Sequence, residues 1–493
     1  MKRILSVISL VILVFLPGVS LLAATYYVDS SQGDDKNSGL AALSPWRTLD
    51  KVNHASFNPG DSILLKRGAV WREPLVPCSG DATGYVTYGC YGDPSAPKPL
   101  LLGSISRNRP EDWKSAGSNV WIAVASQAPA TGGDEVLINR DIGNLIFGGG
   151  QSCGVKVWQE SDLARQGQFW SDADHSLVKL YSSENPAARY GTIELAIKRI
   201  MIDEGGGKSY MRFENLDLRY GAAHGFGGGG VHHSRIDHCD LSFIGGALQF
   251  YVKGKPVRYG NGIEFFNNAH DCYVSNCRIG EIYDAALTNQ GLTNANQHSL
   301  AQYNIYYWNN TVWNSEYSYE YWLSASCYAS NICFVNNTCV NAGGGWGHDQ
   351  RPDGHNGRHL MFYSNGADVH HFYIRNNIFC AATESAFRLF PMWNGLTNLV
   401  MDHNLYFGTS GKLVDWRGTV FGWPDLNKYQ EFTGKDQSSM VADPLFRDVA
   451  KSDFRLLPGS PALGAGAEVG SLQNPFWKPE KAGSRQNIGA DQR

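Results

Sequence analysis

The chain has 493 residues and carries 42 Lys and Arg against 46 Asp and Glu, a net charge of −4 at pH 7. A nucleic-acid-binding protein would show a basic face or stripe, and the sequence has no such run, which argues against that class. Charged residues make up only 18% of the chain, while 55 residues are Gly and 12% are aromatic. This composition is typical of an extended β-protein with a polar groove lined by rings.

Residues 1–24 have the pattern of a secretory signal peptide. Lys2 and Arg3 precede an apolar run of roughly 13 residues, and Ala23 and Ala24 supply a small-residue cleavage site. No later stretch approaches the roughly 20 apolar residues that span a bilayer. We therefore expect a secreted or periplasmic protein without a transmembrane segment, and the lack of Cys at the cleavage point argues against a lipid anchor.

Two segments precede the regular part of the chain. In residues 25–100, alternation such as that of Tyr26 and Val28 flanks turn-rich stretches, which predicts an N-terminal cap and the first coils. A cap has a physical reason, because an open solenoid end exposes unpaired strand edges and apolar core. Residues 101–199 are rich in alternation and turns, and we expect an inserted small β region or decorated coils there.

Residues 200–407 repeat one unit several times. Each unit holds a short alternating apolar run, an Asn-containing bend, a second short run and a Gly-rich loop, which predicts an all-β, right-handed parallel β-helix. Asn tolerates the left-handed backbone of a tight bend, and stacked amides hydrogen-bond between coils, so these residues are assigned a structural role. The bend positions are Asn215, His238, Asn276, Asn310, Asn337, Asn377 and Asn404.

Residues 408–493 are expected to form the last coils and a closing segment that ends in NIGADQR. This segment, the opening TYYVDSSQGDDKNSG and the repeats resemble secreted bacterial parallel β-helix proteins of the pectate-lyase-like superfamily, of the carbohydrate-active enzyme type. The resemblance implies a short capping helix over residues 44–49 and a turn at residues 59–61 before a strand. It leaves the activity open, because this fold carries lyases, hydrolases, epimerases, adhesins and phage tailspikes.

Ten cysteines follow the leader. Export permits disulfides, yet Cys also packs well as a small buried hydrophobe, which is the favoured interpretation. Cys239, Cys272, Cys277 and Cys333 lie at repeated distances from the bends, which suggests stacking between coils, with disulfides between neighbouring coils as the alternative. No Cys-x-x-Cys pair occurs, which argues against a Cys-rich zinc site.

Acidic, His, Arg and aromatic residues recur in the loops between successive bends and converge on one side of the coils. Because coils stack about 4.8 Å apart, residues at similar offsets from the bends are neighbours even when they are distant in sequence. Counting from the bends brings Asp284, Glu320, His348 and Arg388 to one side of the coils. We expect these four residues to line one groove.

Asp284 and Glu320 are the predicted catalytic carboxylates. Apolar and aromatic neighbours in IYDAALTNQ and YSYEYWL tend to raise a carboxyl pKa by desolvation, which a general acid requires. Glycosidases pair such an acid with a nucleophile or base, and His348 is the predicted proton-transfer group. The structural alternatives are a turn cap for Asp284 and a solvated strand residue or Tyr partner for Glu320, and Glu316 is a weaker candidate.

The segment GWGHDQRPDGHNGRH has the densest group of polar side chains and is a predicted binding loop. Arg351 has the donor geometry to hold a carboxylate or sugar hydroxyls, and rings such as Trp322 and Trp346 can stack on pyranose faces. The predicted substrate-binding residues are His224, Glu264, Trp322, Trp346, Asp349, Arg351 and Arg388.

Metal chemistry is a minor alternative at this loop. His348, Asp349 and His355 are suitable ligand types, but their spacing matches no known motif. Glu264 alternates with apolar residues as a strand residue does; it is a candidate sugar contact or calcium ligand, and the structural alternative is an exposed strand residue. We predict no metal and no cofactor, with calcium left open.

The favoured function is a glycoside hydrolase acting as a monomer on a polysaccharide or oligosaccharide. The first alternative is a polysaccharide lyase on a uronic-acid polymer, which needs a base such as Arg388, Arg258, Lys253 or Lys255 and a group that neutralises the substrate carboxylate. A clear Asp cluster for calcium is missing from the sequence, which weighs against the lyase. A non-catalytic carbohydrate-binding or adhesin-like β-helix and an epimerase are the further alternatives.

Overall fold

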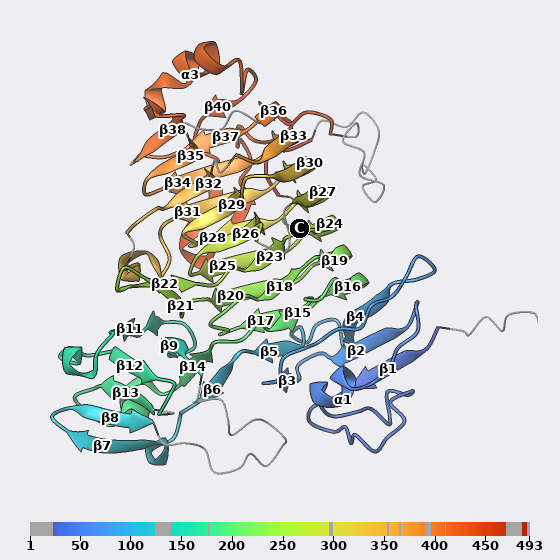
Figure 1. The fold of residues 1–493 in the computed structure, drawn as a ribbon, viewed down its shortest axis with the longest axis vertical. Coiled ribbons are helices and arrows are strands. Elements are labelled where there is room, and N and C mark those ends of the chain that lie inside the picture. Colours follow the sequence, from blue (N-terminus) through green and yellow to red (C-terminus); the bar gives the residue numbers. More distant parts are fainter. Residues whose placement is uncertain are drawn as a thin grey trace, which may run out of the picture.

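The protein is a right-handed parallel β-helix, as the repeats predicted (Figure 1). The computed structural model describes residues 23–123, 140–175, 177–294, 299–352, 354–363, 366–390, 396–409, 411–469 and 486–490. The predicted signal peptide therefore lies almost wholly outside the described residues. Within them, no helix is long and apolar enough to cross a membrane.

Three sheets run along the body, and within residues 209–416 each coil contributes one strand to each of them. Sheet A contains β1 (Thr25–Val28), β2 (Ser62–Lys66), β4 (Val86–Tyr91), β16 (Ser209–Glu214), β19 (His232–Asp237), β24 (His270–Ser275), β27 (Leu300–Trp308), β30 (Cys327–Val335), β33 (Asp368–Arg375) and β36 (Leu396–Asp402). Sheet B contains β3 (Val70–Trp71), β5 (Leu100–Leu102), β17 (Asp217–Arg219), β20 (Asp240–Ile244), β25 (Arg278–Ile282), β28 (Thr311–Trp313), β31 (Thr338–Ala342), β34 (Ile378–Ala382), β37 (Leu405–Phe407) and β40 (Met440–Val441). Sheet C contains β15 (Ile202–Asp203), β18 (Phe226–Gly229), β23 (Ile263–Phe266), β26 (Ala285–Gly291), β29 (Tyr317–Leu323), β32 (Arg358–Phe362), β35 (Ser385–Leu389), β38 (Lys412–Trp416) and β39 (Thr419–Phe421), and the last pair is antiparallel.

A separate, mostly antiparallel region follows β5, and the chain returns to the β-helix at β15 (Figure 1). One of its sheets pairs β6 (Ser104–Ser106), β9 (Ile142–Phe147), β10 (Ser152–Cys153) and β14 (Ile193–Ile197), and α2 (Pro186–Tyr190) precedes β14. The other pairs β7 (Trp113–Gly117), β8 (Val120–Ala123), β11 (Val155–Lys156), β12 (Gln168–Asp172) and β13 (Leu177–Tyr181). The region has a hydrophobic cluster of its own, separate from the core of the coils.

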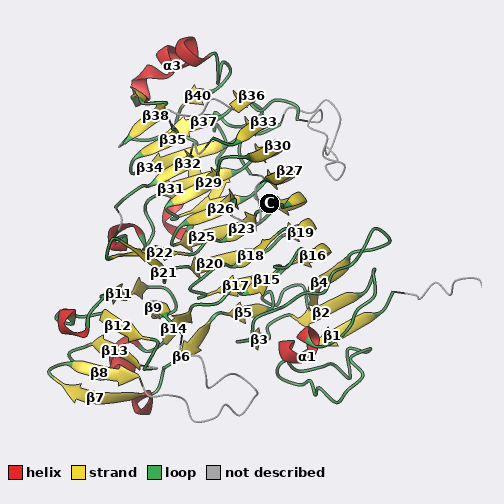
Figure 2. Cartoon of the chain, in the orientation of Figure 1, coloured by secondary structure: helices red, strands yellow, loops and turns green. Residues whose placement is uncertain are grey.

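Short helices lie at the two ends of the solenoid, one at the N-terminal end and one at the C-terminal end (Figure 2). The capping helix α1 (Leu49–Asn53) begins after residues 44–48 and not within them, because Thr48 is its N-cap and Trp46 instead pairs beside β1. The expected turn at residues 59–61 does lead into β2. At the other end, α3 (Leu426–Thr433) inserts Tyr429 into the core. Two hairpins complete the described part of the chain, β21 (Ala247–Val252) with β22 (Lys255–Tyr259) and β41 (Phe446–Asp448) with β42 (Asp453–Leu456).

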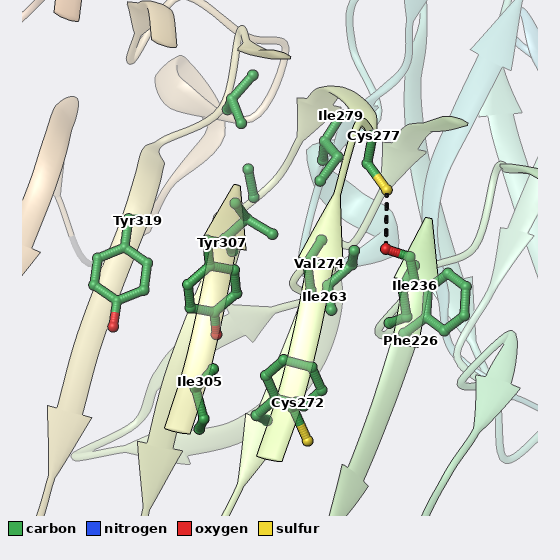
Figure 3. Packing of buried hydrophobic residues seen from close by; sticks show 14 of the residues in the cluster. Phe226, Ile236, Ile263, Cys272, Val274, Cys277, Ile279, Ile305, Tyr307 and Tyr319 are labelled. Carbon is green, nitrogen blue, oxygen red and sulfur yellow. Dashed lines mark hydrogen bonds between the residues drawn. The ribbon is translucent and has the colours of Figure 1, made fainter. Parts of the chain in front are cut away.

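The core between the sheets is one continuous stack of apolar side chains. Figure 3 shows Cys272, Cys277 and Tyr307 filling the same interior as the Ile and Val residues of successive coils. All ten cysteines are free thiols, and seven of them are buried. The interpretation as small hydrophobes therefore agrees with the structure, and the alternative of disulfides between coils does not.

The bend between sheets A and B has two adjacent rows of residues, and the sequence-based alignment had merged them. One row adopts left-handed backbone, with φ between 51° and 58°, and consists of Asn215, His238, Asn276, Asn309, Asn336, Asn376 and His403. The next residue along the chain forms the buried row, where Asn310, Asn337, Asn377 and Asn404 stack. The predicted equivalence of Asn276 with Asn310 was therefore wrong by one residue, because conformational tolerance and amide stacking belong to different positions.

The two rows predict different losses of stability for the same Asn→Gly substitution. Asn337 donates to Tyr307 O and Asn377 Oδ1 and accepts from the backbone and side chain of Asn310. We expect Asn337→Gly to lower the free energy of unfolding by about 2–4 kcal/mol, because buried partners lose their hydrogen bonds. Asn336→Gly is the control, since its φ of 57° suits Gly. Equal melting temperatures for the two variants would contradict this assignment.

Candidate active site

A row of side chains on the outer face of sheet C forms the base of the candidate site. Glu264, Thr288, Glu320, Met361 and Arg388 occupy paired positions on five successive strands, β23 to β35. Their neighbours along each strand, such as Tyr319 and Tyr321, point into the core, so alternation turns this row outward. Strand spacing puts the α-carbons of Glu264 and Glu320 about 10 Å apart.

The loop between β31 and β32 is held beside this row by one buried carboxylate. Glu316 precedes β29, its side chain is 1% exposed, and its Oε2 lies 2.8 Å from His348 Nδ1. Its Oε1 accepts from the backbone N–H of Asn356 and lies 3.7 Å from Arg351 Nε. Glu316 thus acts as the anchor of the loop. This role also accounts for His348, whose pKa is raised chiefly by its hydrogen bond to Glu316.

Arg351 extends from the loop and forms an ion pair with Asp284. Arg351 Nη1 lies 3.1 Å from Asp284 Oδ1 and 3.2 Å from the carbonyl oxygen of Tyr283. The guanidinium also lies over the rings of Tyr283 and Tyr317, 5.2 and 5.9 Å from their centroids. Only 5% of the Arg351 side chain is exposed, against 17% for Asp284. Asp284 is therefore an ion-paired carboxylate that keeps some access to solvent.

Glu320 has the environment of a protonated carboxylic acid. Burial raises its pKa well above the usual value, the nearby charges of Asp284 and Glu264 raise it further, and Arg351 and Gln290 oppose them. Gln290 Nε2 donates to Glu320 Oε2 over 2.7 Å. A neutral acid beside a charged carboxylate is the division that acid–base chemistry requires.

Glu264 is held in place by two residues from the preceding coil and loop. The backbone N–H of Asn261 donates to His224 Nδ1 over 3.1 Å, so neutral His224 carries its proton on Nε2, which lies 3.5 Å from Glu264 Oε1. Asn261 Nδ2 donates to Glu264 Oε2 over 2.7 Å, and Asn261 Oδ1 accepts from Ala285 N. Glu264 is thus oriented on both oxygens, on the same face as Glu320.

Several predicted binding residues have contacts that keep them at the margin of this group. Arg388 pairs with Asp415 at 3.3 Å and lies over the Phe390 ring, two strands beyond Glu320. Trp346 donates to Glu281 O over 3.0 Å and packs against Tyr283. Arg388 and Trp346 are thus held by neighbouring residues at the edge of the site. The expected proximity of Arg388 to Glu320 is not found, because the strand of Met361 lies between them.

The other two predicted contacts are open to solvent to different degrees. Trp322 is partly buried on β29 and lies opposite Gln290, the partner of Glu320. Asp349 is exposed within the short helix His348–Gln350. Sequence analysis missed Asn261 and Gln290, although Asn261 stands in the Gly-Asn-Gly turn just before the strand of Glu264.

One group of side chains at the site has donors of the kind that hold a metal. His348, Asp349 and His355 each place one ligand atom within 4.8 Å of the others. Two imidazoles and a carboxylate suit zinc or a similar transition metal better than calcium, which takes six to eight oxygen ligands. Both oxygens of Glu264 face Asn261 and His224, an arrangement that orients it without a metal.

Comparisons with known proteins found short sequence matches and no matching family model. The chain is 38% identical over 85 residues to a lacto-N-biosidase of Bifidobacterium longum, a stretch covering 16% of this chain and 5% of that protein. It is 37% identical over 62 residues to an uncharacterised protein, YwoF, of Bacillus subtilis, with 13% of each chain covered. The matched stretches thus span a small fraction of these relatives.

The similar solved structures concern the fold alone. They include XylC with xylose (12% identity, TM-score 0.42, covering 78% of this chain and 69% of that one) and pectate lyase Pel9A (13%, 0.41, 96% and 98%). A glycoside hydrolase family 136 lacto-N-biosidase from Eubacterium ramulus is 13% identical, with a TM-score of 0.32 and coverage of 85% and 68%. The parallel β-helix of this chain is shown by its own strand pairing.

The electrostatics of the site predict a directional change in the titration of Glu320. Because the charge of Asp284 raises the Glu320 pKa, Asp284→Asn should lower it. The measurement is the side-chain carboxyl chemical shift of Glu320 in ¹³C-labelled protein as a function of pH. Asp415→Asn, on the same sheet beside Arg388, is the matched control and should leave the Glu320 titration unchanged. A Glu320 pKa that stays constant or rises in Asp284→Asn would contradict the arrangement.

Proposed function

We propose that this protein is a carbohydrate-active enzyme that cleaves glycosidic bonds by hydrolysis. In this proposal Glu320 is the general acid that protonates the leaving-group oxygen, and Asp284 is the carboxylate that acts as nucleophile or base. Glu264, His224, Arg351 and the loop anchored by Glu316 hold the sugar and position these two groups. Substrates are polysaccharides or oligosaccharides outside the cytoplasm, in keeping with the leader expected at residues 1–24.

The observation that carries the proposal is the contrast between the two carboxyl groups. Glu320 is buried and its pKa is raised, whereas Asp284 is paired with a guanidinium at 3.1 Å. Glycoside hydrolysis needs one carboxyl group that is protonated and one that is charged, close to the same bond. The short match to a lacto-N-biosidase agrees with an enzyme acting on carbohydrate, although it covers little of either protein.

The candidate bases for the lyase alternative are engaged or lie elsewhere. Arg258 is 2% exposed and donates to the carbonyl oxygens of Gly246 and Gly143, which ties the antiparallel region to the coils. Arg388 pairs with Asp415. Lys253 and Lys255 are exposed on the β21–β22 hairpin. These contacts favour hydrolysis over β-elimination.

Removing either carboxyl group should abolish most of the activity. Glu320→Gln and Asp284→Asn, made separately, are expected to lower kcat at least 100-fold, because each removes a group that acts in the transition state. The assay follows new reducing ends across a panel of plant, algal and host polysaccharides and oligosaccharides. Full activity in either variant would contradict the catalytic role of the substituted residue. Glu184→Gln and Asp368→Asn are controls, since each changes an exposed ion pair that lies outside sheet C.

The same assay separates hydrolysis from elimination. A lyase product contains an unsaturated uronide that absorbs in the ultraviolet, and a hydrolase product has only the new reducing end. We expect reducing ends without that absorbance. Absorbance that rises in step with the reducing ends would replace hydrolysis with the lyase alternative.

The pH profile should respond to the amide beside Glu320. A general acid is active while protonated, so kcat/KM should fall as pH rises through the Glu320 pKa. Gln290 lowers that pKa through its hydrogen bond, so Gln290→Met should move the alkaline limb to higher pH. An alkaline limb that stays in place or moves to lower pH would show that Glu320 does not set it.

A further inference from the structure

Three histidines gather on the outer face of sheet A, where two successive coils begin their strands. His232 and His233 open β19, and His270 opens β24. Parallel pairing puts His232 directly opposite His270, so the group is set by the backbone register and not by a flexible loop. All three side chains are partly buried and keep contact with solvent. None of them belongs to the carboxylate site on sheet C.

The rings bring their nitrogen atoms together. His232 Nδ1 lies 3.0 Å from His233 Nδ1, and one ring nitrogen of each of the three residues lies within 4.8 Å of the others. The rings of His232 and His270 are nearly parallel, 5° apart, with centroids separated by 4.7 Å. Two imidazoles bound to a tetrahedral metal with bonds of about 2.0–2.1 Å place their nitrogens roughly 3.3 Å apart. The His232–His233 separation of 3.0 Å is close to this value.

The surroundings orient the rings. Tyr210 stacks on His233 at 4.2 Å, and Tyr303 stacks on His270 at 4.6 Å. Asp271 Oδ2 lies 2.8 Å from His270 Nδ1, the kind of carboxylate contact that supports metal-bound histidines.

We propose that His232, His233 and His270 form a binding site for one divalent transition-metal ion of the class that prefers imidazole: zinc, copper or nickel. Such an ion links β19 to β24 and so ties together two adjacent coils. Ring nitrogens suit these metals, whereas calcium and magnesium require oxygen ligands. The remaining coordination positions face solvent and are taken by water.

The chain contains its own comparison on the same face. His370 and His371 open the matching part of β33 and have the register of His232 and His233, two coils beyond Tyr303. Their rings are 6.5 Å apart, and His370 Nε2 contacts Asp368 at 2.9 Å. The residues paired with His370 on either side are Ser330 and Thr397. This pair lacks the third imidazole and is a natural control.

The test is calorimetric titration of ZnCl₂ into the full chain, prepared without a histidine tag and freed of metal with a chelator. The background is His355→Ala, which removes one ligand of the separate group on the β31–β32 loop. We expect binding of one ion and a higher melting temperature with zinc. His270→Gln and His233→Asn should each weaken binding at least tenfold, and Asn suits the left-handed backbone of residue 233, whose φ is 53°.

The control and a second readout keep the proposal falsifiable. His370→Gln should leave zinc affinity unchanged, and loss of binding in that variant would overturn the proposal, as would full affinity in His270→Gln. Electron paramagnetic resonance of the Cu²⁺-loaded unsubstituted chain does not depend on whether the variants fold. Hyperfine coupling to at least two imidazole nitrogens, in a spectrum unchanged by His355→Ala, supports the site, and its absence refutes it.

Discussion

Hydrogen bonding between successive parallel coils is the constraint on which the rest of this structure depends. It fixes the register of each coil on the next, so that Glu264, Thr288 and Glu320 stand in one row although separate loops intervene. The buried amides of Asn310, Asn337, Asn377 and Asn404 lock the same register at the bend. A side chain's partners are therefore set by its position in the coil, and loops of different length between strands leave that position unchanged.

Because of this constraint, several carboxyl groups lie close together and each keeps a different environment. Glu316 anchors a loop through His348, Asp284 forms an ion pair with Arg351, and Glu320 is buried beside Gln290. Like charges at short range cannot all be ionised in a buried setting, and the protein resolves this by giving each group a different partner. Strand register also brings the three imidazoles of His232, His233 and His270 together on sheet A.

Local sequence signals predicted the repeats and the environment of Asp284 and Glu320, but not the partners of these residues. Alternation and aromatic neighbours are visible in a short window, and they indicated that Glu320 would be desolvated. Glu316 appeared turn-like in such a window, yet it is 1% exposed because a loop that begins after β31 folds over it. The one-residue error at the bends arose because Asn serves two purposes at adjacent positions.

The sequence by itself determined the parallel β-helix, since periodic apolar runs and bend residues act within each coil. It also determined which residue types are available for chemistry. Only the tertiary structure decided that Arg351 reaches Asp284, that Gln290 reaches Glu320 and that Arg388 turns instead to Asp415. The reason is physical: these contacts depend on where long loops pack and on how strongly burial and neighbouring charges compete, and neither quantity is encoded in a local pattern.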